Sequence, residues 1–164
     1  MKILYIGGQK SGKSSLAEKK VLKLSKNRIP FYIATYDNSY GDKSMQKRIT
    51  LHHKRRKNRF NIIEKTNKLH DSIYKENIYL VDCLSMWLLN HIMLPEKKII
   101  KELKKILKKD ADMVFVLNDI NNGVIPIDKL SRKYVDLSGI IGQIVAKSCD
   151  IVIRVDCGLQ TKLK

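Results

Sequence analysis

Short continuous apolar runs alternate with longer amphipathic segments along the chain. The apolar runs predict buried strands at residues 2–6, 30–35, 60–63, 78–81, 113–117, 151–155 and 159–163. Helical spacing predicts helices over residues 13–25, 43–56, 67–75, 83–92 and 128–148, and over a segment that Pro95 opens. Continuous apolar strands are typical of a parallel sheet that helices cover on both faces. The pattern therefore predicts one α/β domain over residues 1–164, with a mostly parallel sheet flanked by helices.

The composition favours a folded protein of a reducing compartment. Apolar residues make up 43% of the chain, which is enough for a core at this length. No apolar run reaches the ~18 residues of a membrane span, and no small-residue cleavage site follows the first strand. The three cysteines, Cys83, Cys149 and Cys157, are an odd number and show no Cys-x-x-Cys pattern. We therefore expect a cytoplasmic protein without a membrane span.

Charge is the unusual feature of the composition. Lys and Arg total 33 against 16 Asp and Glu, which gives a net charge of +17. Such a field attracts nucleotides, other phosphorylated molecules or nucleic acid. Lysines scattered over solvated helix faces would, however, need no ligand. Because the sequence has no helix-turn-helix signature, zinc-finger spacing or aromatic stacking platform, we expect no nucleic-acid partner, and a nucleic-acid-binding NTPase is the weaker alternative.

The most specific motif follows the first predicted strand. Residues 7–14 read GGQKSGKS and match the pattern G-x-x-x-x-G-K-[ST] between a strand and a helix. In such a loop, backbone N–H groups surround phosphate oxygens and the next helix points its positive end at the anion. Lys13 would neutralise the β- and γ-phosphates and Ser14 would bind Mg²⁺; the alternative is a glycine-rich turn with an incidental lysine. The phosphate-binding candidates are Gly7, Gly8, Gln9, Lys10, Ser11, Gly12, Lys13 and Ser14.

An acidic residue closes the predicted strand at residues 78–81. Asp82 stands where phosphate-loop enzymes place the aspartate that assists Mg²⁺, so we expect it to act with Ser14. It could also cap the helix that begins at Cys83, and the two roles are compatible. Cys83 itself could approach the site, but burial as a small apolar residue is the simpler interpretation.

A basic segment with two histidines is the second candidate for chemistry. On a helix, Arg48, His52 and either Arg55 or Arg56 would share one face. Neighbouring guanidinium groups disfavour protonation of an imidazole, which keeps it nucleophilic, and they would also bind the phosphates that it attacks. This arrangement suits covalent catalysis through a phosphorus–nitrogen bond. The alternative is a solvated basic helix whose histidine only packs, and the pattern does not choose between His52 and His53.

Several segments in order resemble the bifunctional adenosylcobinamide kinase / adenosylcobinamide-phosphate guanylyltransferase family of cobalamin biosynthesis. They are GGQKSGKS, YIAT at residues 32–35, Arg48-Ile49-x-x-His52 with Arg55 and Arg56, Glu64, LVDCLSMWLLN at residues 80–90, Asn118-Asp119 and GVIP at residues 123–126. The resemblance covers nearly the whole chain. Its departures, such as Asp119 where the family has glutamate, leave the residues of the phosphate loop and His52 unchanged, and they concern the corrinoid side.

The resemblance implies a phosphate-loop NTPase domain of the RecA-like kind, assembled as a homotrimer. It implies phosphorylation of adenosylcobinamide and transfer of GMP from GTP to adenosylcobinamide phosphate, with ATP, GTP and Mg²⁺ taking part. The family carries the GMP on a histidine, which the match places at His52, because His53 stands where the family has Arg or Lys. Our own hypothesis is that Glu64 accepts hydrogen bonds from the guanine N1 and N2 donors, since a carboxylate accepts both. Besides the loop, the implied GTP contacts are Thr35, Tyr36, Asp37, His53, Lys54, Arg55, Arg56, Glu64 and Asp82.

Two other small-molecule functions stay open beside this one. The first is a guanylyltransferase with a weakened or lost kinase activity. The second is a phosphate-loop kinase of another small alcohol. The preferred nucleotide of the kinase step, the corrinoid contacts and the choice between full synthesis and salvage of cobinamide do not follow from the sequence.

Overall fold

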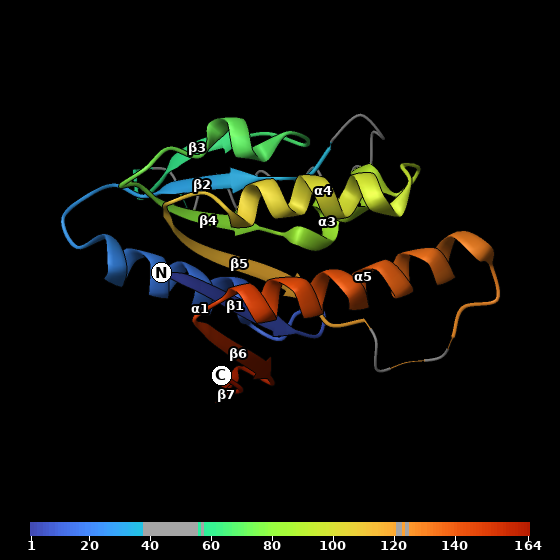
Figure 1. The fold of residues 1–164 in the computed structure, drawn as a ribbon. Coiled ribbons are helices and arrows are strands. Elements are labelled where there is room, and N and C mark those ends of the chain that lie inside the picture. Colours follow the sequence, from blue (N-terminus) through green and yellow to red (C-terminus); the bar gives the residue numbers. More distant parts are fainter. Residues whose placement is uncertain (38–55, 57, 121–122, 124) are drawn as a thin grey trace.

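The computed structural model describes residues 1–37, 56, 58–120, 123 and 125–164 (Figure 1). The helix predicted over residues 43–56 lies outside the described residues except for Arg56, which has helical backbone.

A seven-stranded sheet forms the centre of the molecule, and its order is β3-β2-β4-β5-β1-β6-β7. All neighbouring strands pair in parallel except β6 and β7, which form an antiparallel hairpin at one edge. The prediction of a mostly parallel sheet is therefore confirmed. The strands are β1 (Lys2–Gly7), β2 (Phe31–Ala34), β3 (Asn61–Glu64), β4 (Ile78–Asp82), β5 (Asp112–Asn118), β6 (Ile151–Asp156) and β7 (Leu159–Lys162).

Helices cover both faces of the sheet (Figure 1). On one face, Ile3 and Tyr5 of β1 pack with Ala17 and Val21 of α1 (Lys13–Ser25). On the other face, Leu4 belongs to a larger core that contains apolar residues of α3 (Leu84–His91), α4 (Glu96–Leu107) and α5 (Lys129–Ser148). Alternate residues of one buried strand thus serve two cores, which explains why the strands read as continuous apolar runs.

The prediction of a helix over residues 67–75 is wrong in its extent. Only Leu69–Ser72 is helical, as the 3₁₀ helix η2, and Ile73 already has extended backbone. Leu69 and Ile73 are both buried, so the apolar spacing that suggested a helix is real. One short turn is enough to bury both side chains, and it follows Lys68, whose φ of 45° lies in the left-handed region.

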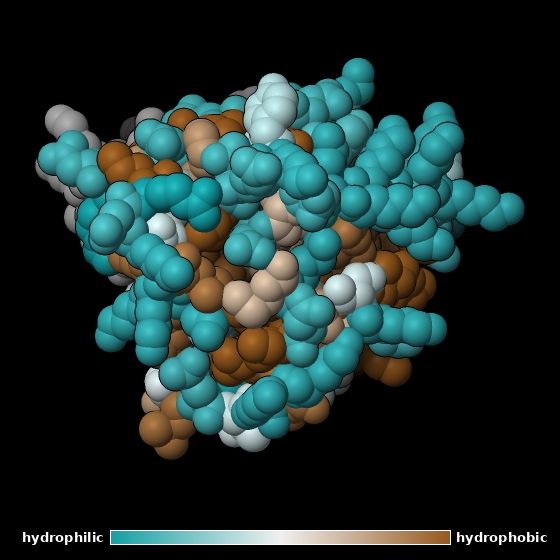
Figure 2. Space-filling model, turned by 60° about the vertical axis from the view of Figure 1, so that its left-hand side comes forward, coloured by the Kyte–Doolittle hydropathy of each residue, from teal (hydrophilic) through white to brown (hydrophobic). Residues whose placement is uncertain are grey.

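The surface is hydrophilic over most of the face shown in Figure 2, with apolar patches between the polar side chains. No described helix is long and apolar enough to cross a membrane.

Gly7 allows β1 and β6 to meet closely where the phosphate loop begins. A Cβ at Gly7 would lie 2.2 Å from the carbonyl oxygen of Val155, whereas a Cβ at Gly8 would meet nothing within 4 Å. We expect Gly7→Ala to lower the free energy of unfolding by about 1–3 kcal/mol. Gly8→Ala, the matched control, should change it by less than about 0.5 kcal/mol. Urea denaturation of both variants measures the difference, and equal midpoints would contradict the close approach.

Candidate functional site

The carboxyl ends of the parallel strands lie together along one edge of the sheet, and several of the predicted site residues that the structure describes lie along it. The strand register pairs Ala34 with Asp82 and with Glu64, and pairs Gly7 with Asn118. Loops that follow the carboxyl ends of parallel strands are where α/β proteins bind ligands. The fold therefore places the phosphate loop, the end of β2 and Asp82 on one edge.

The phosphate loop turns sharply between β1 and α1. Lys10 and Gly12 have positive φ values of 58° and 96°, and the Ser11 N–H donates to the Gly8 carbonyl over 3.2 Å. The ammonium of Lys13 donates to the same Gly8 carbonyl over 3.0 Å, and the lysine is only 6% exposed. Burial lowers the pKa of Lys13, and the nearby Cys83 and Asp82 oppose this shift. The loop thus holds a largely desolvated cation at the start of α1.

The β6–β7 hairpin supports the loop from the side. The turn at Cys157 and Gly158 has positive φ at both residues, and the Gly158 N–H donates to the Ser11 carbonyl over 2.9 Å. An ion pair of 3.2 Å between Arg154 of β6 and Asp119 lies nearby, and the Asp119 N–H donates to the Gly7 carbonyl. The loop is therefore fixed by backbone contacts from two other segments.

The carboxylate of Asp82 accepts hydrogen bonds from three residues of the site. The Ser14 hydroxyl donates to its Oδ1 over 3.2 Å. Its Oδ2 accepts from the Tyr32 hydroxyl over 3.2 Å and from the Arg56 guanidinium over 3.0 Å. The cap position of α3 belongs to Cys83. Asp82 thus contacts the serine at the start of α1 and does not occupy the helix-capping position that was the alternative.

Arg56 is buried and contacts Asp82 and Glu18. Its Nε and Nη2 approach Oε1 of Glu18 at 2.7 and 2.6 Å, and its guanidinium carbon lies 3.8 Å from the centroid of the Tyr32 ring. Burial, together with the Asp82 charge, raises the pKa of Tyr32 well above its usual range. Tyr32 is therefore a neutral hydrogen-bond donor at any physiological pH.

The other residues predicted at the end of β2 and β3 lie along the same edge. The Thr35 hydroxyl donates to the Cys83 carbonyl over 2.7 Å and accepts from the Cys83 N–H over 3.1 Å, and Thr35 is fully buried. Its side chain therefore ties β2 to the end of β4. Tyr36 and Asp37 follow it and are half-buried, and Glu64 is exposed at the end of β3. The predicted residues His52, His53, Lys54 and Arg55 lie outside the described residues.

Glu18 and Tyr32 were not among the predicted site residues. Glu18 follows Ser14 by one helical turn and stands on the buried face of α1 with Ala17 and Val21. An acidic residue at a buried helical position needs a partner, and that signal was available in the sequence. Tyr32 carried no such signal, because an aromatic residue in a buried strand is ordinary.

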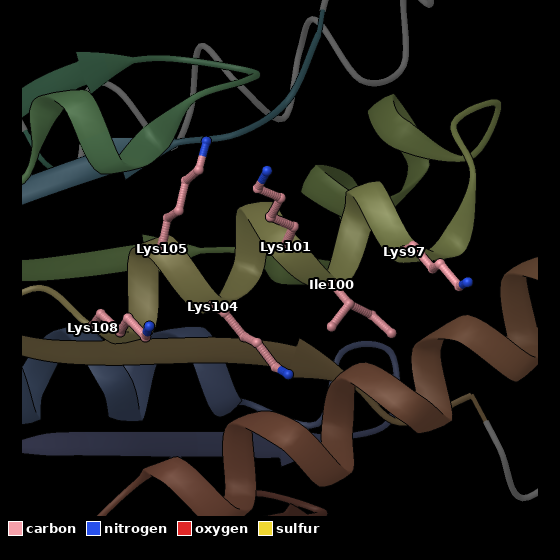
Figure 3. Close-up of a pocket in the computed structure, with 6 residues that line it drawn as sticks. All are labelled: Lys97, Ile100, Lys101, Lys104, Lys105 and Lys108. Carbon is pink, nitrogen blue, oxygen red and sulfur yellow. The ribbon is translucent and has the colours of Figure 1, made fainter.

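The lysines of α4 form a separate basic surface. Lys97, Lys101, Lys104, Lys105 and Lys108 line a shallow hollow of about 390 Å³ on this helix (Figure 3). The helix belongs to the core on the face of the sheet opposite α1. Part of the net positive charge therefore lies on a solvated helix face, away from the helix that carries the phosphate-loop lysine.

Comparison with known proteins identifies the family. The family model described as cobinamide kinase / cobinamide phosphate guanyltransferase matches residues 3–163. The chain belongs to this family. It is 33% identical to the bifunctional adenosylcobalamin biosynthesis protein CobP of Pseudomonas aeruginosa, covering 100% of this chain and 98% of CobP. It is 26% identical to CobU of Escherichia coli, covering 100% of both chains.

Solved structures share the fold of this cobinamide kinase / guanyltransferase family member. The flagellar accessory protein FlaH of Methanocaldococcus jannaschii aligns with a TM-score of 0.54 at 14% identity, covering 99% of this chain and 77% of FlaH. A KaiC-like protein of Pyrococcus horikoshii aligns with a TM-score of 0.53 at 15% identity, covering 93% of this chain and 69% of the KaiC-like protein. The predicted fold class is confirmed.

The three thiols of this family member should differ in reactivity. Cys157 is exposed, whereas burial raises the pKa of Cys83 to about 11 and that of Cys149 to about 12. Because the thiolate is the reactive form, we expect Cys157 to react with a thiol-specific reagent at pH 8 at least ~10-fold faster than Cys83 and Cys149. Cys157→Ser should remove this fast phase, while Cys149→Ser should leave it intact. A fast phase that survives in Cys157→Ser would contradict the assignment.

Proposed function

We propose that this protein phosphorylates adenosylcobinamide and transfers GMP from GTP to adenosylcobinamide phosphate, which yields adenosylcobinamide-GDP and pyrophosphate. The observation that carries the proposal is the contact of 3.2 Å between Ser14 and Asp82 beside the buried Lys13, in a chain of this family. A hydroxyl, a carboxylate and an ammonium at the start of a helix form a site for a triphosphate and its cation.

The residues present fit Mg²⁺. The Ser14 hydroxyl and Oδ1 of Asp82 are hard oxygen donors that already face each other. Mg²⁺ is usually held by one or two such protein oxygens together with substrate phosphates and water. When bound, the ion neutralises charge on the phosphates. Lys13 supplies the other positive charge, and its low solvent exposure strengthens its attraction for a phosphate.

His52 is the proposed nucleophile. One ring nitrogen attacks the α-phosphorus of GTP, the new phosphorus–nitrogen bond forms, and the bond to the bridging oxygen breaks as pyrophosphate leaves. A phosphate oxygen of adenosylcobinamide phosphate then attacks the same phosphorus and frees the ring. Arg56 lies four residues after His52 and contacts Asp82, and four residues of chain span at most about 14 Å. Chain connectivity is therefore consistent with His52 acting on a triphosphate held by Lys13.

The proposed GTP site is completed by Thr35, Tyr36, Asp37 and Glu64, and by the basic residues from His53 to Arg55. In this proposal, Glu64 accepts hydrogen bonds from the guanine base. ATP and GTP are the proposed phosphoryl donors of the kinase step. The proposed assembly is a homotrimer of one domain per chain.

Intact mass measured after incubation with GTP and Mg²⁺ tests the covalent step. The wild type should gain the mass of one GMP in an acid-labile form, because a phosphorus–nitrogen bond hydrolyses in acid. His52→Ala should show no gain, and the matched variant His53→Ala should retain it. The absence of an adduct from a wild type that still binds GTP would refute the transferase mechanism.

A second candidate is a guanylyltransferase without the kinase activity. The observation that favours it is Asp119, shorter than the family's glutamate and paired with Arg154 at 3.2 Å beside the phosphate loop. If both activities are present, His52→Ala should still transfer a phosphate to adenosylcobinamide, since that step does not use the histidine. Isotope transfer from γ-labelled ATP and GTP to adenosylcobinamide and to other small alcohols measures this. A wild type that labels no alcohol but still forms GMP-histidine would select the second candidate.

A further inference from the structure

We infer that Arg56 does not contact the nucleotide phosphates but, together with Glu18 and Tyr32, positions Asp82 toward the cation that accompanies them. The sequence alone placed Arg56 among the GTP contacts and gave Glu18 and Tyr32 no role. The inference rests on the proposed function only in taking GTP with Mg²⁺ as the ligand.

The guanidinium of Arg56 is already engaged on its sides and on one face. Two of its nitrogens contact Oε1 of Glu18 at 2.6 and 2.7 Å, and Nη2 also donates to Asp82 over 3.0 Å. The Tyr32 ring covers one face, and Arg56 is only 2% exposed. A phosphate could reach this group only after the ion pairs were broken, and both carboxylates would then be left buried without their partner.

The charge of the cluster also favours a cation over a phosphate. Arg56 contributes one positive charge, while Glu18 and Asp82 contribute two negative charges, so the three together carry a formal charge of −1. A buried group of net negative charge repels a phosphate and attracts a metal ion. Among the described residues, the buried Lys13 of the phosphate loop supplies a positive charge to the phosphates.

The contacts also divide the two oxygens of Asp82 between two functions. Oδ2 accepts from Arg56 and Tyr32, which fixes the rotation of the carboxylate. Oδ1 then faces Ser14 and the phosphate loop. Groups that hold a metal-binding carboxylate in this way often change metal affinity 10- to 100-fold when they are removed. Arg56 and Tyr32 contact Asp82 directly, and Glu18 acts through Arg56.

The affinity for GTP, measured by calorimetry with Mg²⁺ and again with EDTA, tests the inference. Glu18→Gln and Tyr32→Phe should each reduce the gain in affinity that Mg²⁺ provides by about 10-fold or more. In EDTA, the affinity of Tyr32→Phe should stay within about 2-fold of the wild type. That of Glu18→Gln should not fall, because this variant removes a negative charge that repels the phosphates. Retained binding in EDTA also shows that both variants are folded. Glu102→Gln on α4 is the matched control, because it makes the same substitution at a carboxylate paired with Lys105, and it should change neither value.

A different pattern of affinities is expected if Arg56 binds the phosphates itself. If Arg56 were a phosphate ligand that Glu18 restrains, Glu18→Gln would release it and tighten GTP binding equally with Mg²⁺ and with EDTA. That result, or an unchanged effect of Mg²⁺ in both variants, would overturn the inference. If Glu18→Gln does not fold, Tyr32→Phe decides alone, because it keeps the ring over Arg56 and removes only the hydroxyl. These affinities do not depend on His52. A missing GMP-histidine adduct would therefore refute the proposed transferase mechanism without bearing on the role of Arg56.

Discussion

The carboxylate of Asp82 is the constraint on which the site depends. It lies at the end of a buried strand, and a charge taken out of water there costs several kcal/mol unless hydrogen bonds and opposite charge compensate it. Ser14, Tyr32 and Arg56 provide this compensation from α1, from β2 and from the residue that ends the basic segment. Satisfying one acid thus joins segments that are 26 to 68 residues apart in the chain.

The same contacts explain why α1 begins and packs as it does. Lys13 and Ser14 lie in the first turn at the phosphate loop, and Glu18 lies one turn later over Arg56. Ser14 and Glu18 are four residues apart and share a helical face, which carries a hydroxyl beside Asp82 and an acid for the guanidinium. A helix whose register slipped by one residue would lose both contacts, because each side chain would turn by about 100° away from its partner.

Those parts of the molecule that depend on local sequence could be predicted, and those that depend on distant partners could not. The strands, the phosphate loop and the position of Asp82 follow from short patterns, and the structure confirms where they lie. The 3₁₀ turn at Leu69–Ser72 was taken for a longer helix because two buried residues four apart fit either form. The position of Glu18 on a buried helical face signals a need for a partner, but which residue that partner is, 38 positions away, does not follow from the sequence. Tyr32, 50 residues from Asp82, carried no signal at all. His52 was selected over His53 by family resemblance, since spacing alone does not separate neighbours.

Net charge and local charge act on different parts of binding in this protein. The +17 of the chain, some of it in the lysines of α4, raises the local concentration of any polyanion and so hastens encounter without selecting one. Selection belongs to the site, where the cluster of Arg56, Glu18 and Asp82 has the opposite sign to the surface. A bare triphosphate attracted by the surface would meet that negative cluster beside Lys13. A triphosphate that carries its cation would satisfy both Lys13 and Asp82, and for that reason the proposed site would favour the metal complex over the free nucleotide.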